Sequence, residues 1–154
     1  MPTLADLLSR DRLLLDLRVG SKRELFQELA AAVEAATGVD QTVALAALVQ
    51  REKLGTTGIG DGLALPHARL LGLAKPLAFF ARLARPVDYD ALDERPVDLA
   101  LALVAPEEDS AAQLKALAQL ARLLRDPVLT GRLRREADPA RVYDLLTGQA
   151  AERE

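Results

Sequence analysis

One segment of the sequence concentrates the residues that could bind and transfer an anionic group. It runs from Arg51 to Arg69, reads REKLGTTGIGDGLALPHAR, and contains four of the nine glycines and the only histidine, His67. Glycine permits positive φ and close backbone approach, so the loop around Gly58 and Gly60 could turn its amide N–H groups toward one point and bind an anion. A flexible turn between a helix and a strand is the alternative interpretation of such a cluster.

The order of elements around this loop excludes two nucleotide-binding motifs. A Walker loop needs Gly-Lys-Ser/Thr opening a helix, and a dinucleotide fingerprint needs a strand, a loop and then a helix. Here the expected order is helix, loop and then an extended segment, Leu63–Pro66. The glycines therefore do not predict nucleotide binding.

The residues next to His67 favour phosphoryl chemistry. Pro66 fixes its own φ and stiffens the approach to the histidine. A lone histidine beside apolar residues is more often structural, so its neighbours must decide its role. The hydroxyls of Thr56 and Thr57 and the cation Arg51 could bind a phosphoryl group, although a cation at a helix C-terminus could instead serve the helix dipole. We predict that His67 is a nucleophile.

Composition excludes several competing functions. The 154 residues carry a formal net charge of -3 and are 3% aromatic, so neither a basic field nor stacking platforms for nucleic acid are expected. With no cysteine and one histidine, we expect no metal site and no cofactor. No apolar run reaches the roughly 20 residues that span a bilayer. We therefore expect a cytoplasmic protein without membrane insertion.

Helix starts are marked by residues that can accept the unpaired amide protons of a first turn. Helices are predicted after the caps Ser21, Asp40, Ser110, Asp126 and Asp138. The first is expected to end at Gly38. Ser110 and Gln113 have the spacing of a capping box, which would open a long helix to about Arg125.

Strands are predicted in the middle of the chain, at residues 77–83 and 97–104. In the second run, leucine alternates with small or apolar residues, which is typical of a strand covered on both faces. The pattern predicts an α/β fold, with a mixed central β-sheet flanked by helices on both faces. A single domain is expected over residues 1–154, with about 148–154 as a loose C-terminal tail.

These motifs together resemble the phosphohistidine signature of the enzyme IIA domains of the bacterial phosphotransferase system, fructose and mannitol class. The likeness is greatest to the nitrogen-regulatory branch, because residues 51–53, 55–60 and 64–67 all fall in register with its motif. Further similarity lies at Pro86, Asp90, Asp93 and residues 96–99, so the resemblance covers nearly the whole chain.

The resemblance implies a function for these residues. His67 would be phosphorylated, through its Nε2 atom, by a small HPr-like phosphocarrier protein, without a cofactor. Phosphorylation would then control regulated target proteins. The residues expected to bind the phosphate or support its site are Arg51, Thr56, Thr57, Gly58, Gly60 and Gln113.

Two positions depart from the family pattern. Ala68 stands where glycine usually follows the histidine, and Gln113 stands where a second histidine commonly lies. Gln113 either completes the cap with Ser110 or hydrogen-bonds His67 or its phosphate. Two alternative functions follow: a regulatory binding module with a degenerate, non-phosphorylated site, and a sugar-specific enzyme IIA of a fructose-type permease.

Overall fold

The computed structural model describes residues 3–148. Its α-helices are α1 (Leu4–Leu7), α2 (Lys22–Thr37), α3 (Gln41–Lys53), α4 (Ser110–Leu124), α5 (Pro127–Arg135) and α6 (Pro139–Thr147). Its strands are β1 (Leu13–Leu17), β2 (Gly58–Gly60), β3 (Leu63–Ala64), β4 (His67–Leu70), β5 (Leu77–Val87) and β6 (Val97–Pro106). The expected tail lies outside the described residues, apart from Gly148, which caps α6 in the left-handed conformation.

The strands form one mixed sheet with β6 at its centre. The order is β1-β5-β6-β3-β2, and β4 also pairs with β6. β5 runs antiparallel to β6, whereas β3 and β4 both run parallel to it. β1 adds a parallel edge beside β5. The predicted mixed sheet is confirmed.

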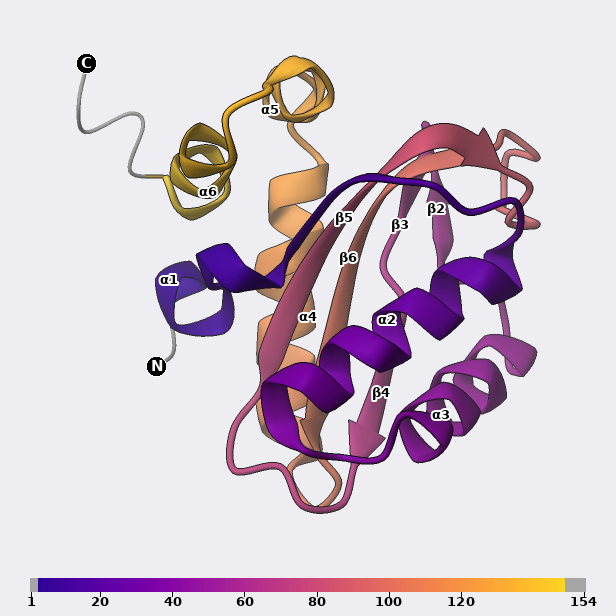
Figure 1. Cartoon of the computed structure of the whole chain (residues 1–154), viewed down its shortest axis with the longest axis vertical. Coiled ribbons are helices and arrows are strands. Elements are labelled where there is room, and N and C mark those ends of the chain that lie inside the picture. Colours follow the sequence, from indigo (N-terminus) through magenta and orange to yellow (C-terminus); the bar gives the residue numbers. More distant parts are fainter. Residues whose placement is uncertain (1–2, 149–154) are drawn as a thin grey trace.

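Helices cover both faces of this sheet. α2 and α3 lie on one face and α4 on the other, with α1, α5 and α6 beside α4 (Figure 1). Alternate residues of β6 supply the two cores: Leu99, Leu101 and Leu103 pack under α4, while Ala100 and Ala102 pack under α2 and α3. The two-residue period of a strand explains this division. The leucine-alanine alternation in the sequence therefore predicted a strand that is buried on both faces.

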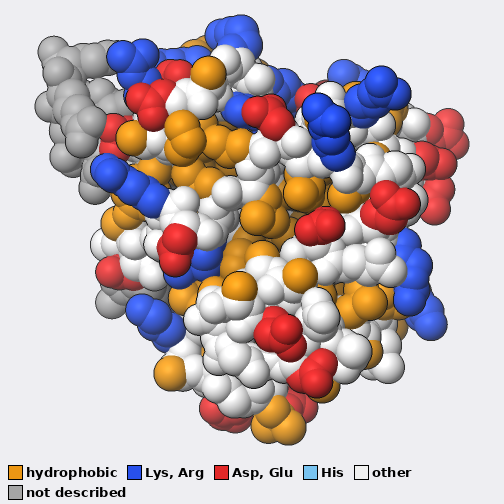
Figure 2. Space-filling view, in the orientation of Figure 1, with side chains coloured by type: hydrophobic (Ala, Val, Ile, Leu, Met, Phe, Trp, Pro, Cys, Tyr) orange, Lys and Arg blue, Asp and Glu red, His pale blue; other side chains and the backbone are white. Residues whose placement is uncertain are grey.

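The outer surface is mixed in charge on the face that carries α2 and α3. Figure 2 shows Lys and Arg side chains interspersed with Asp and Glu there. Within residues 3–148, the helices are all too short or too polar to cross a membrane.

Four of the predicted helix caps are correct, and one is wrong. Ser21, Asp40, Asp126 and Asp138 each accept a first-turn amide. At α4, however, the cap is Asp109, whose carboxylate accepts from Ala112 N at 3.0 Å, and Ser110 is the first helical residue. A carboxylate one position earlier satisfies the free amide and also favours the positive end of the helix dipole. The side chain of Gln113 therefore does not form the predicted capping box with Ser110.

The short strands were not predicted as such. β3 and β4 lie on the same neighbour, β6, and are separated by Leu65 and Pro66. The extended conformation expected for this stretch is present, but its pairing with β6 depends on residues that lie about forty positions later in the chain. Local sequence patterns do not contain that information.

We predict that Leu101→Ala destabilises the fold by about 2–5 kcal/mol, since Leu101 is fully buried in the core under α4. The free energy of unfolding, measured by denaturant titration, checks this. Leu92→Ala is the matched control, because Leu92 is 79% exposed and its truncation should change stability by less than about 0.5 kcal/mol. Equal effects of the two substitutions would contradict the assigned core.

Candidate functional site

His67 is placed by a break between two short strands. It is the first residue of β4 and lies opposite Leu103 of β6. Just before it, the Pro66 carbonyl accepts a hydrogen bond from Leu103 N at 2.9 Å. Proline can occupy this break because it offers only a carbonyl to the ladder and needs no partner for an N–H. The break fixes the half-buried imidazole at the start of β4, a strand that lies against α3.

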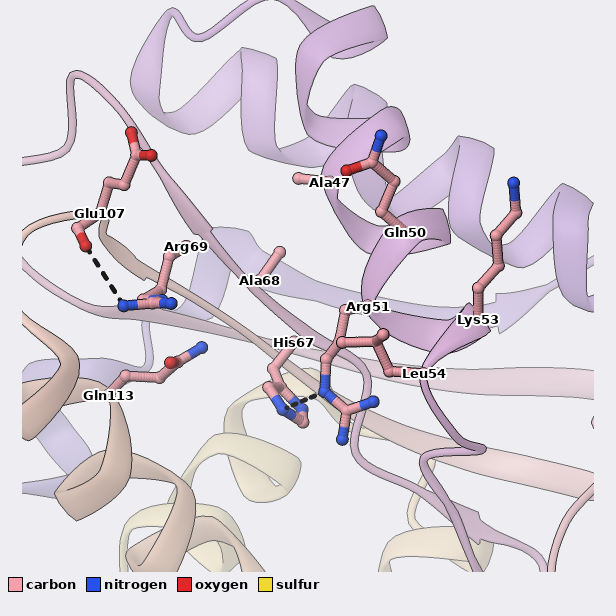
Figure 3. Close-up of a pocket in the computed structure, with 10 residues that line it drawn as sticks. All are labelled: Ala47, Gln50, Arg51, Lys53, Leu54, His67, Ala68, Arg69, Glu107 and Gln113. Carbon is pink, nitrogen blue, oxygen red and sulfur yellow. Dashed lines mark hydrogen bonds between the residues drawn. The ribbon is translucent and has the colours of Figure 1, made fainter.

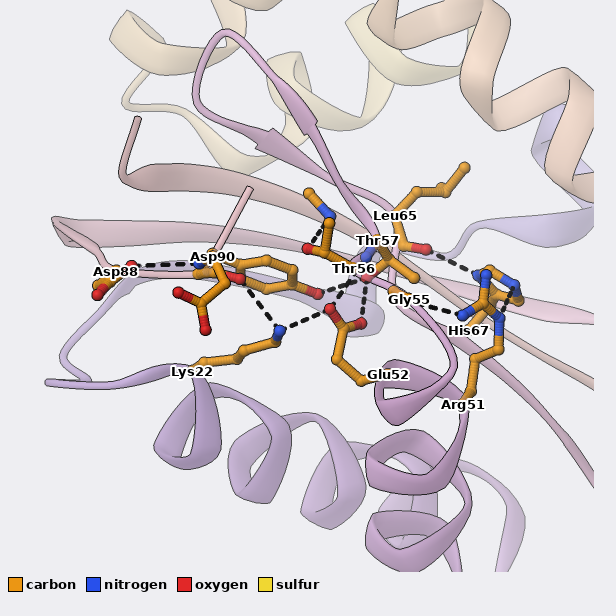
Figure 4. A network of polar contacts seen from close by, with 12 residues as sticks. Lys22, Arg51, Glu52, Gly55, Thr56, Thr57, Leu65, His67, Asp88 and Asp90 are labelled. Carbon is orange, nitrogen blue, oxygen red and sulfur yellow. Dashed lines mark hydrogen bonds and ion pairs between the residues drawn. The ribbon is translucent and has the colours of Figure 1, made fainter. Parts of the chain in front are cut away.

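Both ring nitrogens of His67 have a defined partner. Nδ1 lies 2.8 Å from the Leu65 carbonyl oxygen, and Nε2 lies 3.1 Å from Nε of Arg51 (Figure 4). A carbonyl can only accept and a guanidinium N–H can only donate. The proton therefore lies on Nδ1, and Nε2 carries the lone pair. This tautomer makes Nε2 the nucleophilic atom of the ring.

The surroundings of His67 keep the imidazole neutral. Burial lowers the pKa of His67 below its usual value, because a charged ring loses hydration there. The Leu65 carbonyl acts in the opposite direction, and the positive charge of Arg51 lowers the pKa further. The lone pair on Nε2 is thus available at neutral pH, as a nucleophile requires.

Arg51 connects His67 to the glycine loop. It lies in the last turn of α3, and its Nη1 donates to the Gly55 carbonyl at 3.0 Å while its Nε donates to His67. The guanidinium is planar, so two fixed donors set its orientation. A position in the last turn also favours a cation through the helix dipole. The helix-stabilising interpretation of Arg51 and its contact with His67 are therefore compatible.

A cavity of about 700 Å³ opens beside the imidazole (Figure 3). It is lined by Ala47, Gln50, Arg51, Lys53, Leu54, His67, Ala68, Arg69, Glu107 and Gln113. Three of these side chains are cationic and one is a carboxylate. Gln113 enters from α4, on the side of His67 opposite Arg51 (Figure 3). Such a cationic pocket can accept a dianionic group.

The four remaining residues expected at the site do not line this cavity: Thr56 and Thr57 lie in the loop before β2, and Gly58 and Gly60 are the ends of β2. Thr57 is buried, with its hydroxyl 2.6 Å from Glu52 Oε1 and 2.7 Å from the Tyr89 hydroxyl. The hydroxyl of Thr56 accepts from Gly58 N at 3.1 Å. Both threonine hydroxyls therefore stabilise the loop.

The two glycines allow close packing of β2. A Cβ atom on Gly58 would lie 2.7 Å from Cβ of Ala91, which is too close for any other residue. Gly60 has φ +101°, a conformation that favours glycine. These two glycines thus allow the segment after β5 to pack closely against β2. The structure brings His67, Arg51 and Gln113 together at one cavity. The two threonines and the two glycines lie outside the lining of that cavity.

Arg69 is a lining residue that was not predicted from the sequence. It follows His67 by two positions on β4, and alternate residues of a strand share a face. That spacing could have indicated it. Its Nη1 lies 3.5 Å from the Glu107 carbonyl oxygen. Ala68, between the two, is buried with the core under α2 and α3 and also borders the cavity, so the core accommodates its methyl group.

No candidate metal site is found in the part of the chain that the structure describes. Among residues 3–148, no three His, Cys, Asp or Glu side chains are close enough to one another to hold a metal ion. The polar side chains that line the cavity are instead a neutral imidazole, three cations, two amides and one carboxylate, so the net charge of the lining is positive. This set fits an anionic phosphoryl group.

Known proteins resemble this chain over nearly its whole length. A nitrogen regulatory protein of Bradyrhizobium diazoefficiens is 45% identical over 143 residues, which cover 93% of this chain and 94% of that protein. The crystal structure of nitrogen regulatory protein IIA-Ntr from Neisseria meningitidis superposes with a TM-score of 0.87 at 33% identity, and covers 92% of this chain and 97% of that one.

A more distant structure shares the fold. The mannitol enzyme IIA from Escherichia coli, solved in complex with phosphorylated enzyme IIB, has a TM-score of 0.78 at 19% identity and covers 92% of this chain and 99% of that one.

Residues 6–149 match the family described as phosphoenolpyruvate-dependent sugar phosphotransferase system, EIIA 2. This chain therefore belongs to the EIIA 2 family of the bacterial phosphotransferase system.

Proposed function

We propose that this chain accepts a phosphoryl group on Nε2 of His67 from an HPr-like phosphocarrier, and that the phosphorylation state of His67 controls target proteins in the cytoplasm. The observation that carries the proposal is the tautomer of His67, whose unprotonated Nε2 lies at a cavity with three cations. The regulatory role is supported by relatives named nitrogen regulatory protein. These relatives favour it over a sugar-specific enzyme IIA.

The proposed transfer is an in-line displacement. The Nε2 lone pair attacks the phosphorus of the donor phosphohistidine, the donor N–P bond breaks, and its electron pair returns to the donor ring. The proton on Nδ1 stays in place, and its bond to the Leu65 carbonyl stabilises the positive charge that develops on the ring. Arg51 gives up its bond to Nε2 and turns its N–H groups to the phosphoryl oxygens.

The charges around the cavity favour the transferred group. Lys53 and Arg69 line it together with Arg51, so three cations face a group with two negative charges. Gln113 adds an amide that can donate to a phosphoryl oxygen from the opposite side (Figure 3). This amide performs part of the role that a second histidine would have, and it carries no proton that titrates.

Phosphorylation would change how this surface binds other proteins. A phosphate monoester carries about -1.5 to -2 charges at neutral pH, and a comparable charge on His67 would neutralise much of the cationic rim. A target protein that docks beside His67 would therefore distinguish the two states. The complex of the distant mannitol enzyme IIA with a phosphorylated enzyme IIB supports a protein partner for this chain as well.

We predict one acid-labile phosphoryl group per chain after incubation with phosphoenolpyruvate, enzyme I and an HPr-like carrier, measured by intact-protein mass spectrometry. His67→Ala should acquire none, because no other histidine is present. If the wild-type protein acquires none either, the chain is a non-phosphorylated binding module and the proposal is wrong.

The pH dependence of transfer should follow His67. Its pKa is lowered, so an NMR titration of the ring should give a midpoint below the ordinary value of about 6.5, and the transfer rate should fall as the pH falls through that midpoint. The same shift makes the unfolded chain bind the proton first, so the free energy of unfolding should decrease as the pH falls below about 6.5. A midpoint above 6.5 would contradict the assigned environment.

Gln113→Glu should slow phosphoryl transfer by roughly ten- to a hundredfold. The substitution keeps the shape of the side chain but replaces an amide donor with a negative charge beside the incoming dianion, a loss of about 1.5–3 kcal/mol for a hydrogen bond to a charged group. Rapid-quench measurement of transfer from the phosphorylated carrier checks this. Gln27→Glu, on the exposed surface of α2, makes the same change in net charge and should leave the rate unchanged. Equal rates for both variants would show that Gln113 does not face the phosphoryl group.

A further inference from the structure

We infer that Glu52 is a positioning residue for His67, acting through a buried polar bridge that it forms with Lys22, Thr57 and Tyr89. These four residues, the polar bridge, come from α2, α3, the loop before β2 and the segment after β5. Only the transfer measurement below rests on the proposed function.

The carboxylate of Glu52 accepts from three donors. Its Oε2 accepts from Lys22 Nζ at 2.6 Å and from Thr57 N at 2.9 Å, and its Oε1 accepts from Thr57 Oγ1 at 2.6 Å (Figure 4). The side chain is 8% exposed. Burial raises the pKa of Glu52, but the hydrogen bonds from Lys22 and Thr57 outweigh it and leave that pKa lowered. Glu52 is therefore an ionised carboxylate held in one orientation.

Tyr89 is the hydrogen-bond donor at one end of the polar bridge, and Glu52 is the acceptor. Because the Thr57 hydroxyl donates to Glu52, it must accept from the Tyr89 hydroxyl, 2.7 Å away. Burial, followed by the charge of Glu52, raises the pKa of Tyr89, so its phenol stays protonated and donates. Lys22 Nζ also donates to the Tyr89 carbonyl at 3.0 Å and lies 4.4 Å from the centre of its ring. Every member is thus fixed by at least two contacts.

The bridge reaches Nε2 of His67 through the loop. Glu52 and Thr57 close residues 53–56 into a short loop, because the carboxylate binds both the amide and the hydroxyl of Thr57. Inside that loop, the Gly55 carbonyl accepts from Arg51 Nη1 at 3.0 Å, and Arg51 Nε donates to Nε2. Successive residues of α3, Arg51 and Glu52, thus face the imidazole and the bridge respectively (Figure 4).

The bridge also reaches Nδ1. The Thr57 carbonyl accepts from Leu65 N at 2.9 Å, and the Leu65 carbonyl in turn accepts from Nδ1 of His67 at 2.8 Å. Both partners of the imidazole are therefore hydrogen-bonded to the loop that Glu52 holds: Arg51 to the Gly55 carbonyl and Leu65 to the Thr57 carbonyl. A rotation of Thr57 would alter the two partners of the ring together.

The chemistry of the bridge suits orientation better than stability. A buried ion pair is a weak stabiliser, since the loss of hydration offsets much of the attraction, whereas its hydrogen bonds specify direction. The mechanism needs such direction, because misplacement of a reacting group by about 1 Å can cost a factor of about 100 in rate.

Two substitutions test this inference. Glu52→Gln removes the charge but keeps the shape, and Thr57→Val removes the hydroxyl while keeping the charge of Glu52. Each should slow phosphoryl transfer on the order of tenfold. Each should also speed the hydrogen exchange of Arg51 Nε–H, observed by NMR in the unphosphorylated protein. Thr57→Ser restores the hydroxyl and should recover most of both signals. Glu28→Gln, on the exposed face of α2, is the control for the change in charge.

The pKa of His67 distinguishes two effects of the substitutions, a movement of Arg51 and a loss of the Glu52 charge. Arg51 and Glu52 are the charged groups that influence it, and they act in opposite directions. Loss of the Glu52 charge alone would lower the pKa of His67, whereas release of Arg51 from the ring would raise it. Thr57→Val leaves both charges in place, so a raised pKa in that variant indicates that Arg51 has moved.

The inference is overturned if folded Thr57→Val keeps the wild-type exchange rate of Arg51 Nε–H and the wild-type pKa of His67. Should Glu52→Gln fail to fold, Thr57→Val decides the question alone. If the wild-type protein accepts no phosphoryl group, the proposed function fails, but the two NMR measurements still decide whether the bridge positions His67.

Discussion

The rest of the site depends on one imidazole whose tautomer is fixed by two different hydrogen bonds. The Leu65 carbonyl keeps the proton on Nδ1, and the guanidinium of Arg51 points at the lone pair of Nε2. A histidine with a free choice of tautomer would present the reactive lone pair only part of the time. Here the choice is made by two groups of fixed polarity, a carbonyl and a guanidinium. Burial and the positive charge of Arg51 oppose protonation of the ring.

The fold supplies this arrangement from parts that are far apart in the sequence. The imidazole begins a short strand on β6, the guanidinium ends α3, and the amide of Gln113 comes from the first turn of α4. The central sheet brings these three together because α3 and α4 cover opposite faces of it, and β4 lies at the boundary between them (Figure 1). A cavity with a cationic rim is the result.

The membership of the EIIA 2 family and the geometry of the site are consistent with each other. A protein that carries a phosphoryl group needs a nucleophile that is accessible to a partner and an environment that tolerates both charge states. The cavity beside His67 would provide the access, and its cations would reduce the free-energy difference between the states. The neutral amide of Gln113 leaves the protonation of the site to His67 alone, which is a simpler electrostatic arrangement than a pair of interacting histidines.

The sequence by itself determined the family and the two-faced sheet, and it singled out His67 as the candidate nucleophile. His67 is the only histidine, Pro66 precedes it, and the leucine-alanine alternation of residues 99–104 requires burial on both sides. These features are local, so period and motif suffice to identify them. The N-cap of α4 was misplaced by one residue, because Asp109 and Ser110 are both good caps and local sequence does not rank them.

Only the tertiary structure decided which residues surround His67. The sequence suggested that Thr57 binds phosphate, whereas its hydroxyl lies between Glu52 and Tyr89, and Tyr89 is 32 positions away along the chain. Gly58 was expected in an anion-binding loop, but its lack of a side chain allows Ala91 to pack against β2. Contacts across such separations are set by the pairing of strands and the packing of helices on them. No period or motif in a single sequence records which residues those elements bring together.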